Sequence, residues 1–461
     1  MNHSQQRHPS SYRDPAGFIF EEDGVIYRQI NHVYRSHYDH FMQSGLYARL
    51  LDEGLIVSHE EVPNRTNTEA YKTLKPARIP FISYPYEWCH EQMKDAARLT
   101  LEIQQISLTY GMTLKDATPY NIQFIGARPI FIDTLSWEIL DSGAPWVAYR
   151  QFCEMFLAPL AISQYVGQPV SRSLRAWPDG VPLRTASNSL PLRSRWNLPV
   201  SLHIHLHARI AKKSSQQSTP ARKQSDTDRK RILQSLQEAV NRLTYRPERS
   251  SWTNYYTQLD QREDYLQNKE RIIHEWIAEI GPIEQVLDAG SNLGHFSRHM
   301  DRSTRVVAVD YDADTVQETY LKAKKQSDQT QIEAVLPLQL DLADLSPDQG
   351  LLNQERRSFL KRAHFDLVMG LALIHHLILG KQIPIEKAIQ LLSNLSGQWL
   401  ILEFVPIDDP WSKLLVEGKL GQIHPYDRTS FEKWVSNDFE ICTSCQIHPT
   451  ERWLYKLKKK N

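Results

Sequence analysis

The stretch Val286-Leu287-Asp288-Ala289-Gly290-Ser291-Asn292-Leu293-Gly294-His295-Phe296 decides the fold of the second half of this chain. Its apolar start predicts a strand buried on both faces, and its glycines predict a turn that leads into a helix. A second apolar strand, 305–309, ends in Asp310, which lies twenty residues after Gly290. In nucleotide-binding βαβ units a carboxylate at this place accepts hydrogen bonds from ribose hydroxyls. The stretch therefore predicts a doubly wound α/β domain that binds a nucleotide.

The spacing of the glycines indicates which nucleotide the turn holds. The dinucleotide pattern is Gly-x-Gly-x-x-Gly, with the pyrophosphate over a helix N-terminus. This chain has Gly-x-x-x-Gly instead, and Asp288 stands two residues before the first glycine. A carboxylate at the strand tip would repel a pyrophosphate, whereas it suits a ligand that carries an ammonium group and a sulfonium. S-adenosylmethionine is such a ligand.

The pattern Asp-x-Gly-x-x-x-Gly-x-Phe, followed by Asp310, resembles motif I and its successor in the class I S-adenosylmethionine-dependent methyltransferases. Later segments follow the order of that family: 338–342 resembles the end of its third strand, 365–377 its fourth strand and the following segment, and 399–406 its fifth strand. Segments 439–447 and 452–457 predict a terminal antiparallel hairpin. The resemblance covers roughly residues 250 to 461 and implies a seven-stranded Rossmann-like sheet.

The resemblance also implies a cofactor site at the carboxyl ends of the strands. Methyl transfer from a sulfonium needs a base only where the acceptor must lose a proton. His375, His376 and Glu403 follow strand ends at this edge and are the candidates for that base, with capping or packing as the alternative role for the histidines. The residues expected to contact S-adenosylmethionine are Asp288, Gly290, Ser291, Asn292, Gly294, Asp310, Asp341, Leu342 and Leu371.

The composition and the absence of certain motifs limit the classes of methyl acceptor that are expected. Neither Asn-Pro-Pro-Tyr nor Asp-Pro-Pro-Tyr follows the predicted fourth strand, so methylation of a base amine or a glutamine amide is not supported. A small molecule, a carbohydrate or a lipid-like acceptor is expected instead. Lys+Arg and Asp+Glu are both 54, which gives no overall attraction to nucleic acid or to an anionic membrane. No apolar run approaches a membrane span and no signal-peptide core is present, so the predicted location is the cytoplasm.

A polar, aromatic-free segment at 212–231 divides the chain. It predicts an N-terminal accessory domain over 1–211, a linker over 212–231 and the methyltransferase domain over 232–461. An aromatic segment at 252–256 precedes motif I, and its tyrosines could either fold over the cofactor or pack between helices.

The front domain, for which an α+β fold is expected, carries a pattern that resembles the catalytic loop of protein-kinase-like folds. A long amphipathic helix, about 91–110, is followed by Asp116, Asn121, a short hairpin and Asp133. The resemblance implies a base-like role for Asp116 and magnesium ligation by Asn121 and Asp133; no other metal ligand is predicted. However, no Gly-rich loop and no strand Lys with a helix Glu partner are evident, and Asp-Thr-Leu replaces Asp-Phe-Gly. The alternative is a helical domain in which Asp116 and Asn121 cap turns.

Two smaller patterns raise the question of a metal site. His203, His205 and His207 would share one face of a strand but scatter on a helix, and surface histidines are the preferred interpretation. Cys442 and Cys445 lie in a predicted strand, where side chains alternate in direction, which favours packing.

Three functions are therefore carried forward. The leading hypothesis is a methyltransferase whose front domain helps to recognise the acceptor. The second is a bifunctional enzyme with phosphoryl transfer in front and methyl transfer behind. The third is a non-catalytic scaffold that binds S-adenosylmethionine.

Overall fold

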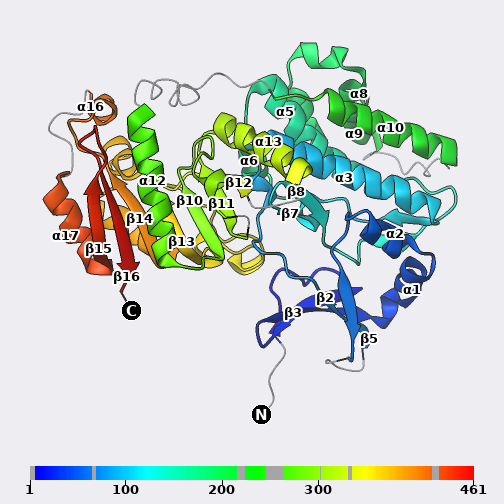
Figure 1. The fold of residues 1–461 in the computed structure, drawn as a ribbon. Helices are drawn as coiled ribbons and strands as arrows, with labels where there is room; N and C mark the ends of the chain where they lie inside the picture. Colours follow the sequence, from blue (N-terminus) through cyan, green and yellow to red (C-terminus); the bar gives the residue numbers. More distant parts are fainter. Residues whose placement is uncertain are drawn as a thin grey trace. The chain divides into compact units, whose positions relative to one another are not determined.

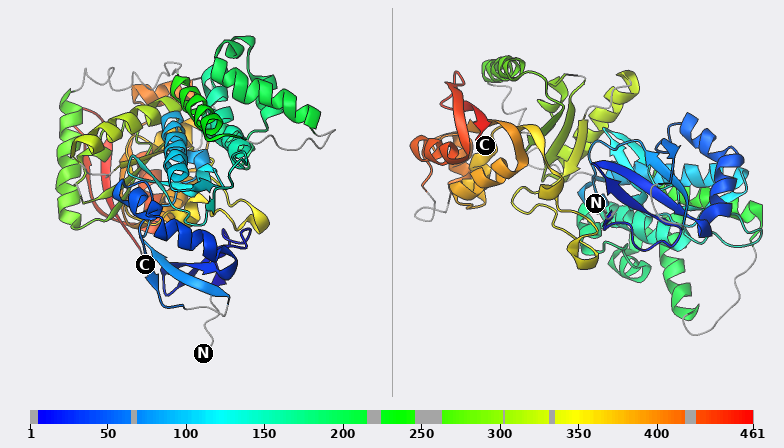
Figure 2. Two further views of the ribbon diagram at one scale, coloured as in Figure 1. Left: turned by 90° about the vertical axis from the view of Figure 1, so that its right-hand side faces the viewer. Right: turned by 90° about the horizontal axis from the view of Figure 1, so that it is seen from below.

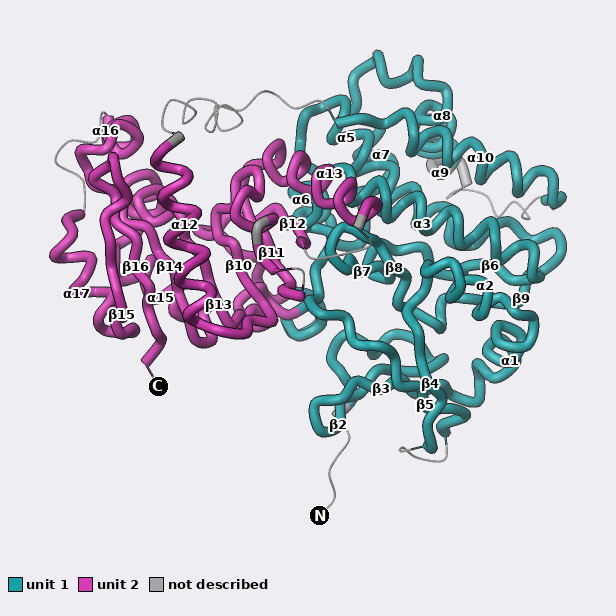
Figure 3. The backbone as a smooth tube through the Cα atoms, viewed as in Figure 1, with its two compact units in different colours: residues 1–246, 349–356 teal, residues 247–348, 357–461 magenta. Residues whose placement is uncertain are grey.

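A computed structural model describes residues 6–64, 69–214, 224–245, 263–301, 303–330, 335–417 and 425–460. The chain forms two units, which are coloured separately in Figure 3. Unit 1 comprises residues 1–246 and 349–356, and unit 2 comprises 247–348 and 357–461. The short segment 349–356 thus interrupts the sequence of unit 2 but packs within unit 1. There Glu355 accepts hydrogen bonds from Tyr12 and Arg13, both at 3.1 Å, and the Arg356 guanidinium lies over the Tyr120 ring at 5.0 Å.

Unit 2 is built on a seven-stranded sheet with the order β12-β11-β10-β13-β14-β16-β15 (Figure 1). The first five of these strands are parallel, and β16 runs antiparallel to both of its neighbours. This is the doubly wound, seven-stranded Rossmann-like sheet with an antiparallel terminal hairpin that the sequence predicts, so the prediction of this fold is confirmed. The strands are β10 (Gln285–Ala289), β11 (Arg305–Asp310), β12 (Val335–Gln339), β13 (Phe365–Gly370), β14 (Ser396–Phe404), β15 (Phe439–Gln446) and β16 (Trp453–Lys459).

The central strands of this sheet are buried on both faces. Val286, Leu287 and Ala289 of β10 are fully buried, as are most residues of β11 and β13. Helices cover both faces, which explains why these strands read as continuous apolar runs (Figures 1 and 2). The helices of unit 2 are α12 (Glu263–Ile280), α13 (Ala313–Thr330), α14 (Phe359–Arg362), α15 (Ile385–Leu395), α16 (Pro410–Val416) and α17 (Arg428–Asp438).

Strand β10 lies between β11 and β13, and the strand order reverses there. Successive crossovers leave β10 in opposite directions, so the loops that follow β10 and β13 diverge at the carboxyl edge of the sheet. In open α/β sheets this switch point leaves a crevice in which ligands bind. The topology therefore places the candidate site at the carboxyl ends of β10, β11 and β13.

Unit 1 begins with an antiparallel five-stranded sheet in the order β1-β2-β3-β5-β4. Its β2–β3 hairpin turns at Asp23 and Gly24, as the Asp-Gly dipeptide predicts. The strands are β1 (Gln6–Arg7), β2 (Gly17–Glu22), β3 (Val25–Asn31), β4 (His59–Val62) and β5 (Ala70–Pro76). The helices α1 (Arg35–Gln43) and α2 (Leu46–Asp52) lie between β3 and β4 in the sequence.

The second part of unit 1 is mainly helical and starts with the long helix α3 (His90–Thr109). Strand β6 (Met112–Leu114) pairs with β9 (Trp137–Ile139), and β7 (Ile122–Ile125) forms a hairpin with β8 (Arg128–Phe131). The predicted α+β character of the front domain is confirmed. Further helices and helical turns described in this part are η3 (Pro119–Asn121), α4 (Tyr149–Phe152), η4 (Cys153–Leu157), α5 (Ala158–Val166), α6 (Val170–Ala176), α7 (Leu183–Ser189), η5 (Leu192–Trp196), α8 (Leu198–Val200), η6 (Ser201–Leu206), α9 (His207–Ser214) and α10 (Asp226–Arg242).

Helix α10 spans the end of the predicted linker and the start of the predicted methyltransferase domain, but it packs against α3 of unit 1. One contact is the hydrogen bond from Arg98 Nε to Asn241 Oδ1 at 3.0 Å. The predicted linker, 212–231, overlaps both α9 and α10, and 215–223 lies outside the described residues. The aromatic segment 252–256 lies outside them as well.

Two further expectations can be compared with the structure. None of the described helices combines the length and the apolar character that a membrane crossing requires. The preferred interpretation of the alternating histidines as surface residues is wrong for His203 and His205, which are buried in a helical segment. Their ring nitrogens contact the hydroxyl groups of Tyr149, Ser187, Ser194 and Ser235, because the segment packs its inner face against α7 and α10.

Candidate functional site

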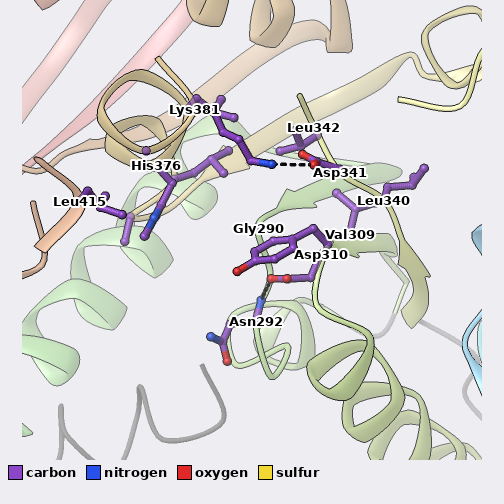
Figure 4. Close-up of a pocket in the computed structure, with 15 residues that line it drawn as sticks. Gly290, Asn292, Val309, Asp310, Leu340, Asp341, Leu342, His376, Lys381 and Leu415 are labelled. Carbon is purple, nitrogen blue, oxygen red and sulfur yellow. Dashed lines mark hydrogen bonds and ion pairs between the residues drawn. The ribbon is translucent and has the colours of Figure 1, made fainter. Parts of the chain in front are cut away.

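A cavity of about 260 Å³ lies at the carboxyl edge of the unit 2 sheet (Figure 4). Its walls come from the turn after β10, the tip of β11, residues 340–342, the segment 372–381 and Leu415 of α16. The volume is of the order of the ~300 Å³ at the lower end of small-ligand pockets. The cavity stands where the sheet topology and the glycine turn both predict a ligand.

The turn after β10 forms the floor of the cavity because its backbone comes close to neighbouring elements. Gly290 and Asn292 line the cavity, and both have positive φ. Gly294 also has a positive φ, and a Cβ placed there would lie 2.7 Å from Thr319 Cγ2 of α13. Thr319 Oγ1 donates to the Asn292 carbonyl at 3.1 Å, so α13 is packed directly on the turn. A side chain at Gly294 would separate the two.

Asp310 lies at the tip of β11 with its carboxylate in the cavity lining (Figure 4). Its two oxygens accept hydrogen bonds from the backbone N–H groups of Asn292 (2.8 Å) and Asp312 (3.0 Å). Burial raises the pKa of Asp310 to about 6. Each carboxylate oxygen can accept a second hydrogen bond, so the backbone fixes the group while it remains able to bind hydroxyl groups.

A second carboxylate, Asp341, lies in the lining after β12 and is paired with a cation. Its Oδ2 contacts Lys381 Nζ at 3.0 Å, and its Oδ1 accepts from the Ala343 N–H at 2.9 Å. Lys381 lines the same cavity but was not among the predicted residues. It stands forty residues from Asp341 in a segment with no recognisable motif, so spacing alone could not have linked the two.

The remaining predicted cofactor residues divide between the cavity lining and positions next to it. Leu342 lines it, whereas Ser291, Gly294 and Leu371 form the adjacent backbone. Asp288 is buried beneath the turn, where it accepts a hydrogen bond from Ser297 Oγ. Burial raises the pKa of Asp288 to about 6. Asp288 therefore organises the turn from below.

The two histidines after β13 differ in their surroundings. His376 lines the cavity, and burial lowers its pKa to about 4. His375 is 1% exposed, and neither of its ring nitrogens has a hydrogen-bond partner among the described residues. Burial lowers the pKa of His375 well below its usual value. Both rings are therefore neutral near pH 7, and of the two only His376 forms part of the cavity lining.

Glu403, the third candidate base, is fully buried in an ionic cluster. Its carboxylate contacts Lys269 Nζ at 2.6 Å, Tyr265 Oη at 2.7 Å and Arg452 Nη1 at 3.4 Å. Burial alone would raise the pKa of Glu403, but Lys269 and Arg452 outweigh it and lower that pKa. Because its oxygens are engaged by two cations and a hydroxyl, Glu403 is a poor proton acceptor. It joins α12, β14 and the start of β16.

The kinase-like residues of unit 1 lie in one hydrogen-bonded cluster. Asn121 Nδ2 donates to Ser136 Oγ at 3.0 Å, and Ser136 Oγ donates to Asp133 Oδ2 at 2.5 Å. Asp116 accepts from Gln151 Nε2 at 2.6 Å, and burial raises its pKa.

Asp133 of this cluster forms an ion pair with Arg28 of β3, a residue to which no sequence pattern points. Burial alone would raise the pKa of Asp133, but Arg28 and the hydrogen bonds lower it. A guanidinium thus contacts the carboxylate that the kinase resemblance assigns to magnesium. Within the described ranges, no group of three or more His, Cys, Asp or Glu residues is placed to hold a metal ion.

Comparisons with known proteins complete the description. No family model matches the chain. It is 26% identical over 462 residues to the nodulation protein NoeA of Rhizobium meliloti (strain 1021), with 97% of this chain and 95% of NoeA covered.

Solved structures of methyltransferases match part of the chain. One is magnesium protoporphyrin IX methyltransferase (ChlM) from Synechocystis PCC 6803 with bound SAH, at 21% identity and a TM-score of 0.32, covering 42% of this chain and 84% of ChlM. Another is the N-methyltransferase NodS from Bradyrhizobium japonicum WM9 in complex with S-adenosyl-L-homocysteine, at 11% identity and a TM-score of 0.33. This match covers 43% of this chain and 88% of NodS. A third is the bifunctional kinase-methyltransferase WbdD, at 16% identity and a TM-score of 0.27. This match covers 43% of this chain and 39% of WbdD.

Proposed function

We propose that this protein transfers a methyl group from S-adenosylmethionine to a small-molecule or carbohydrate acceptor, and that unit 1 helps to recognise the acceptor. The observation that carries the proposal is the position of Asp310, whose backbone-held carboxylate lines a cavity at the switch point of a methyltransferase-type sheet. The relation to NoeA extends over nearly the whole of both chains, so both units are shared with a protein named for nodulation.

The residues of the cavity suit the parts of this cofactor. Asp310 offers two acceptor oxygens to a pair of ribose hydroxyls, and Asp341 offers a further acceptor nearby. The turn at Gly290 and Asn292 exposes backbone close to the cavity. The carboxylate of Asp310 also attracts a ligand that is positively charged at its sulfonium and its ammonium group.

When bound, S-adenosylmethionine supplies a methyl group on an already activated leaving group, so positioning contributes most of the catalysis. His376 is neutral near pH 7 and lies in the cavity lining, where it can accept a hydrogen bond from an acceptor hydroxyl. A base whose pKa is about 4 takes up a proton weakly near pH 7. We therefore assign His376 a role in orienting the acceptor more than in removing its proton.

Isothermal titration with S-adenosylmethionine and its demethylated product tests the cofactor assignment. We expect Asp310→Asn to weaken binding by about 1.5–3 kcal/mol, because a charged hydrogen-bond acceptor is lost. Asp366→Asn is the matched control. Asp366 also accepts two backbone N–H bonds, from Glu284 (3.0 Å) and Gln285 (2.9 Å), but at the amino ends of the strands.

The control variant should bind the cofactor like the wild type. Equal affinity in Asp310→Asn and the wild type would refute the ribose assignment. Cofactor binding without methyl transfer to any candidate glycan or small hydroxyl compound would instead favour the scaffold hypothesis.

A further inference from the structure

One part of unit 1 has a charge composition unlike the rest of the chain. Between Asp179 and Asp226 there is no Asp or Glu, although acidic and basic residues are equal in number over the whole protein. The same segment contains eight basic residues, namely Arg184, Arg193, Arg195, Arg209, Lys212, Lys213, Arg222 and Lys223. It is therefore a locally cationic stretch in a chain without net charge.

The middle of this segment is a helical run formed by α8, η6 and α9, whose inner face is firmly fixed to unit 1 (Figure 1). Val200 and Ile204 are fully buried. His203 lies between Tyr149 Oη (2.7 Å) and Ser235 Oγ (2.9 Å), and His205 lies between Ser187 Oγ and Ser194 Oγ, both at 2.8 Å. These bonds set the rotation of the run about its axis and therefore determine which side chains face outward.

The outward face is apolar. Leu198, Leu202, Leu206 and Ile210 recur every four residues and are 74%, 44%, 44% and 54% exposed. Trp196, in the turn before them, is 89% exposed. A single exposed leucine is ordinary, but a row of large apolar side chains that ends in a bare tryptophan marks an interaction surface.

Basic side chains flank this row. Arg193, Arg195 and Arg209 are all exposed. The basic apolar face is defined by Trp196, Leu198, Leu202, Leu206 and Ile210 with Arg193, Arg195 and Arg209. A helix of this kind, with Trp and Leu on one side and Arg at its margins, matches a lipid–water interface, where the rings and aliphatic groups enter the acyl boundary and the cations contact phosphates.

We propose that the basic apolar face docks unit 1 on an anionic lipid bilayer. Charge complementarity selects this occupant, because the exposed cations beside the row, Arg193, Arg195 and Arg209, suit a surface that is negative everywhere. A protein partner would need acids and an apolar groove in matching positions. The face is also a row of exposed side chains on one helical run, which can lie parallel to a membrane plane. The proposal is independent of the methyltransferase assignment and adds a peripheral membrane location.

Co-sedimentation of the full-length protein with vesicles tests the proposal. We expect binding to phosphatidylcholine vesicles that contain phosphatidylglycerol and much weaker binding to phosphatidylcholine alone. The triple variants Trp196→Ser/Leu202→Ser/Leu206→Ser and Arg193→Gln/Arg195→Gln/Arg209→Gln should each lower the partition coefficient at least ~10-fold. The control is Val33→Ser/Leu352→Ser, which removes apolar side chains that are 69% and 78% exposed elsewhere in unit 1 and should bind like the wild type.

Quenching of tryptophan fluorescence by brominated lipids gives a second measurement. It tests the position of Trp196 in protein that is still bound to vesicles. We expect part of the tryptophan fluorescence to be quenched on anionic vesicles and this part to disappear in Trp196→Phe. Absence of vesicle binding, or equal binding by the wild type and both triple variants, would overturn the proposal. Binding that depends on Trp196 but is seen only with an acidic protein would overturn it as well.

Discussion

In the proposed cofactor site, Asp310 would bind the backbone and the ligand with the same two oxygens. The N–H groups of Asn292 and Asp312 hold the carboxylate in place, and burial raises its pKa to about 6. A carboxyl group with this pKa is partly protonated just below neutral pH, and a proton removes both an acceptor site and the attraction for a cationic ligand. The affinity of the cavity for S-adenosylmethionine is therefore expected to depend on pH.

We expect the dissociation constant for S-adenosylmethionine to rise as the pH falls through about 6. Calorimetric titrations at several pH values measure this change, and Asp310→Asn should show a smaller one. Asp288, whose pKa is also raised to about 6, accounts for the change that remains in the variant. A pH-independent wild type would contradict the interpretation of Asp310 as a titrating ligand group.

The stability of the unliganded protein depends on pH in the opposite direction from its affinity for the cofactor. Both carboxyl groups have a folded pKa above the usual value near 4. They contribute stability to the unliganded protein that is complete below about pH 4 and is lost as the pH rises through about 6. Denaturant unfolding with and without cofactor, on either side of this range, separates this contribution from ligand binding.

Gly294 offers a second test at the scale of one residue. Gly294→Ala adds a Cβ that would lie 2.7 Å from Thr319 Cγ2, in a backbone conformation with φ of +65°. Gly281→Ala is the matched control, because Gly281 has φ of +91° but no atom within 4 Å of the added Cβ. We expect about 1–2 kcal/mol of destabilisation from the backbone alone at Gly281. We expect ~1–3 kcal/mol more at Gly294, measured by urea unfolding.

The two glycine variants should also differ in cofactor binding. Only Gly294→Ala should weaken it, since only that residue supports the turn under the cavity. Equal loss of stability in both variants would mean that the approach of α13 to the turn is not tight.

Among the elements of unit 2, the cluster around Glu403 holds α12 to the sheet. Lys269 and Tyr265 come from α12, Glu403 from β14, and Arg452 immediately precedes β16. Arg452 also contacts Asp409 just before α16, at 2.9 Å. The cluster is buried, so removal of one charge leaves the opposite charges uncompensated in the interior.

We expect Glu403→Gln to lower the free energy of unfolding by about 3–5 kcal/mol. Glu279→Gln is the control, because Glu279 also joins α12 to β16, through Lys456, but is 60% exposed. It should cost less than about 1 kcal/mol. Thermal and urea unfolding measure both, and a stable but inactive Glu403→Gln protein would instead favour Glu403 as the general base.

The sequence predicts the strands of unit 2 well because their signals are local. Val286 and Leu287 show burial, the glycines show the turn, and Asp310 and Asp341 stand at strand ends. Contacts between distant residues give no such signal. Glu403 and Lys269 are 134 residues apart, and Asp341 and Lys381 are 40 apart, so their pairing could not be read from spacing. The same reason explains why the sequence suggests Glu403 as a candidate base and does not reveal Arg28 as the partner of Asp133.

For the molecule as a whole, the contacts in unit 1 bear on the hypothesis of a second activity. The structure brings Asp116, Asn121 and Asp133 into one cluster, but Arg28 already compensates the charge of Asp133. Magnesium would have to displace this guanidinium to bind there. The contacts therefore favour a recognition role for unit 1 over phosphoryl transfer.

We expect magnesium-ATP to give no protection from hydrogen exchange around Asp116 and Asp133 in the full-length protein. S-adenosylmethionine should protect the turn at Gly290 in the same experiment and so serves as its positive control. Protection of the Asp133 region by magnesium-ATP, but not by ATP without the metal, would revive the bifunctional hypothesis.

The segment 349–356 has a consequence for how this protein could have arisen and how it can be divided. Since the chain enters unit 1, leaves it, and later returns for eight residues, no single junction in the gene separates the two units. Recombination at one point would strand Glu355 and Arg356 from Tyr12, Arg13 and Tyr120. The two halves are thus expected to be inherited together, and a split reporter or a domain exchange has to graft this small loop along with the front half.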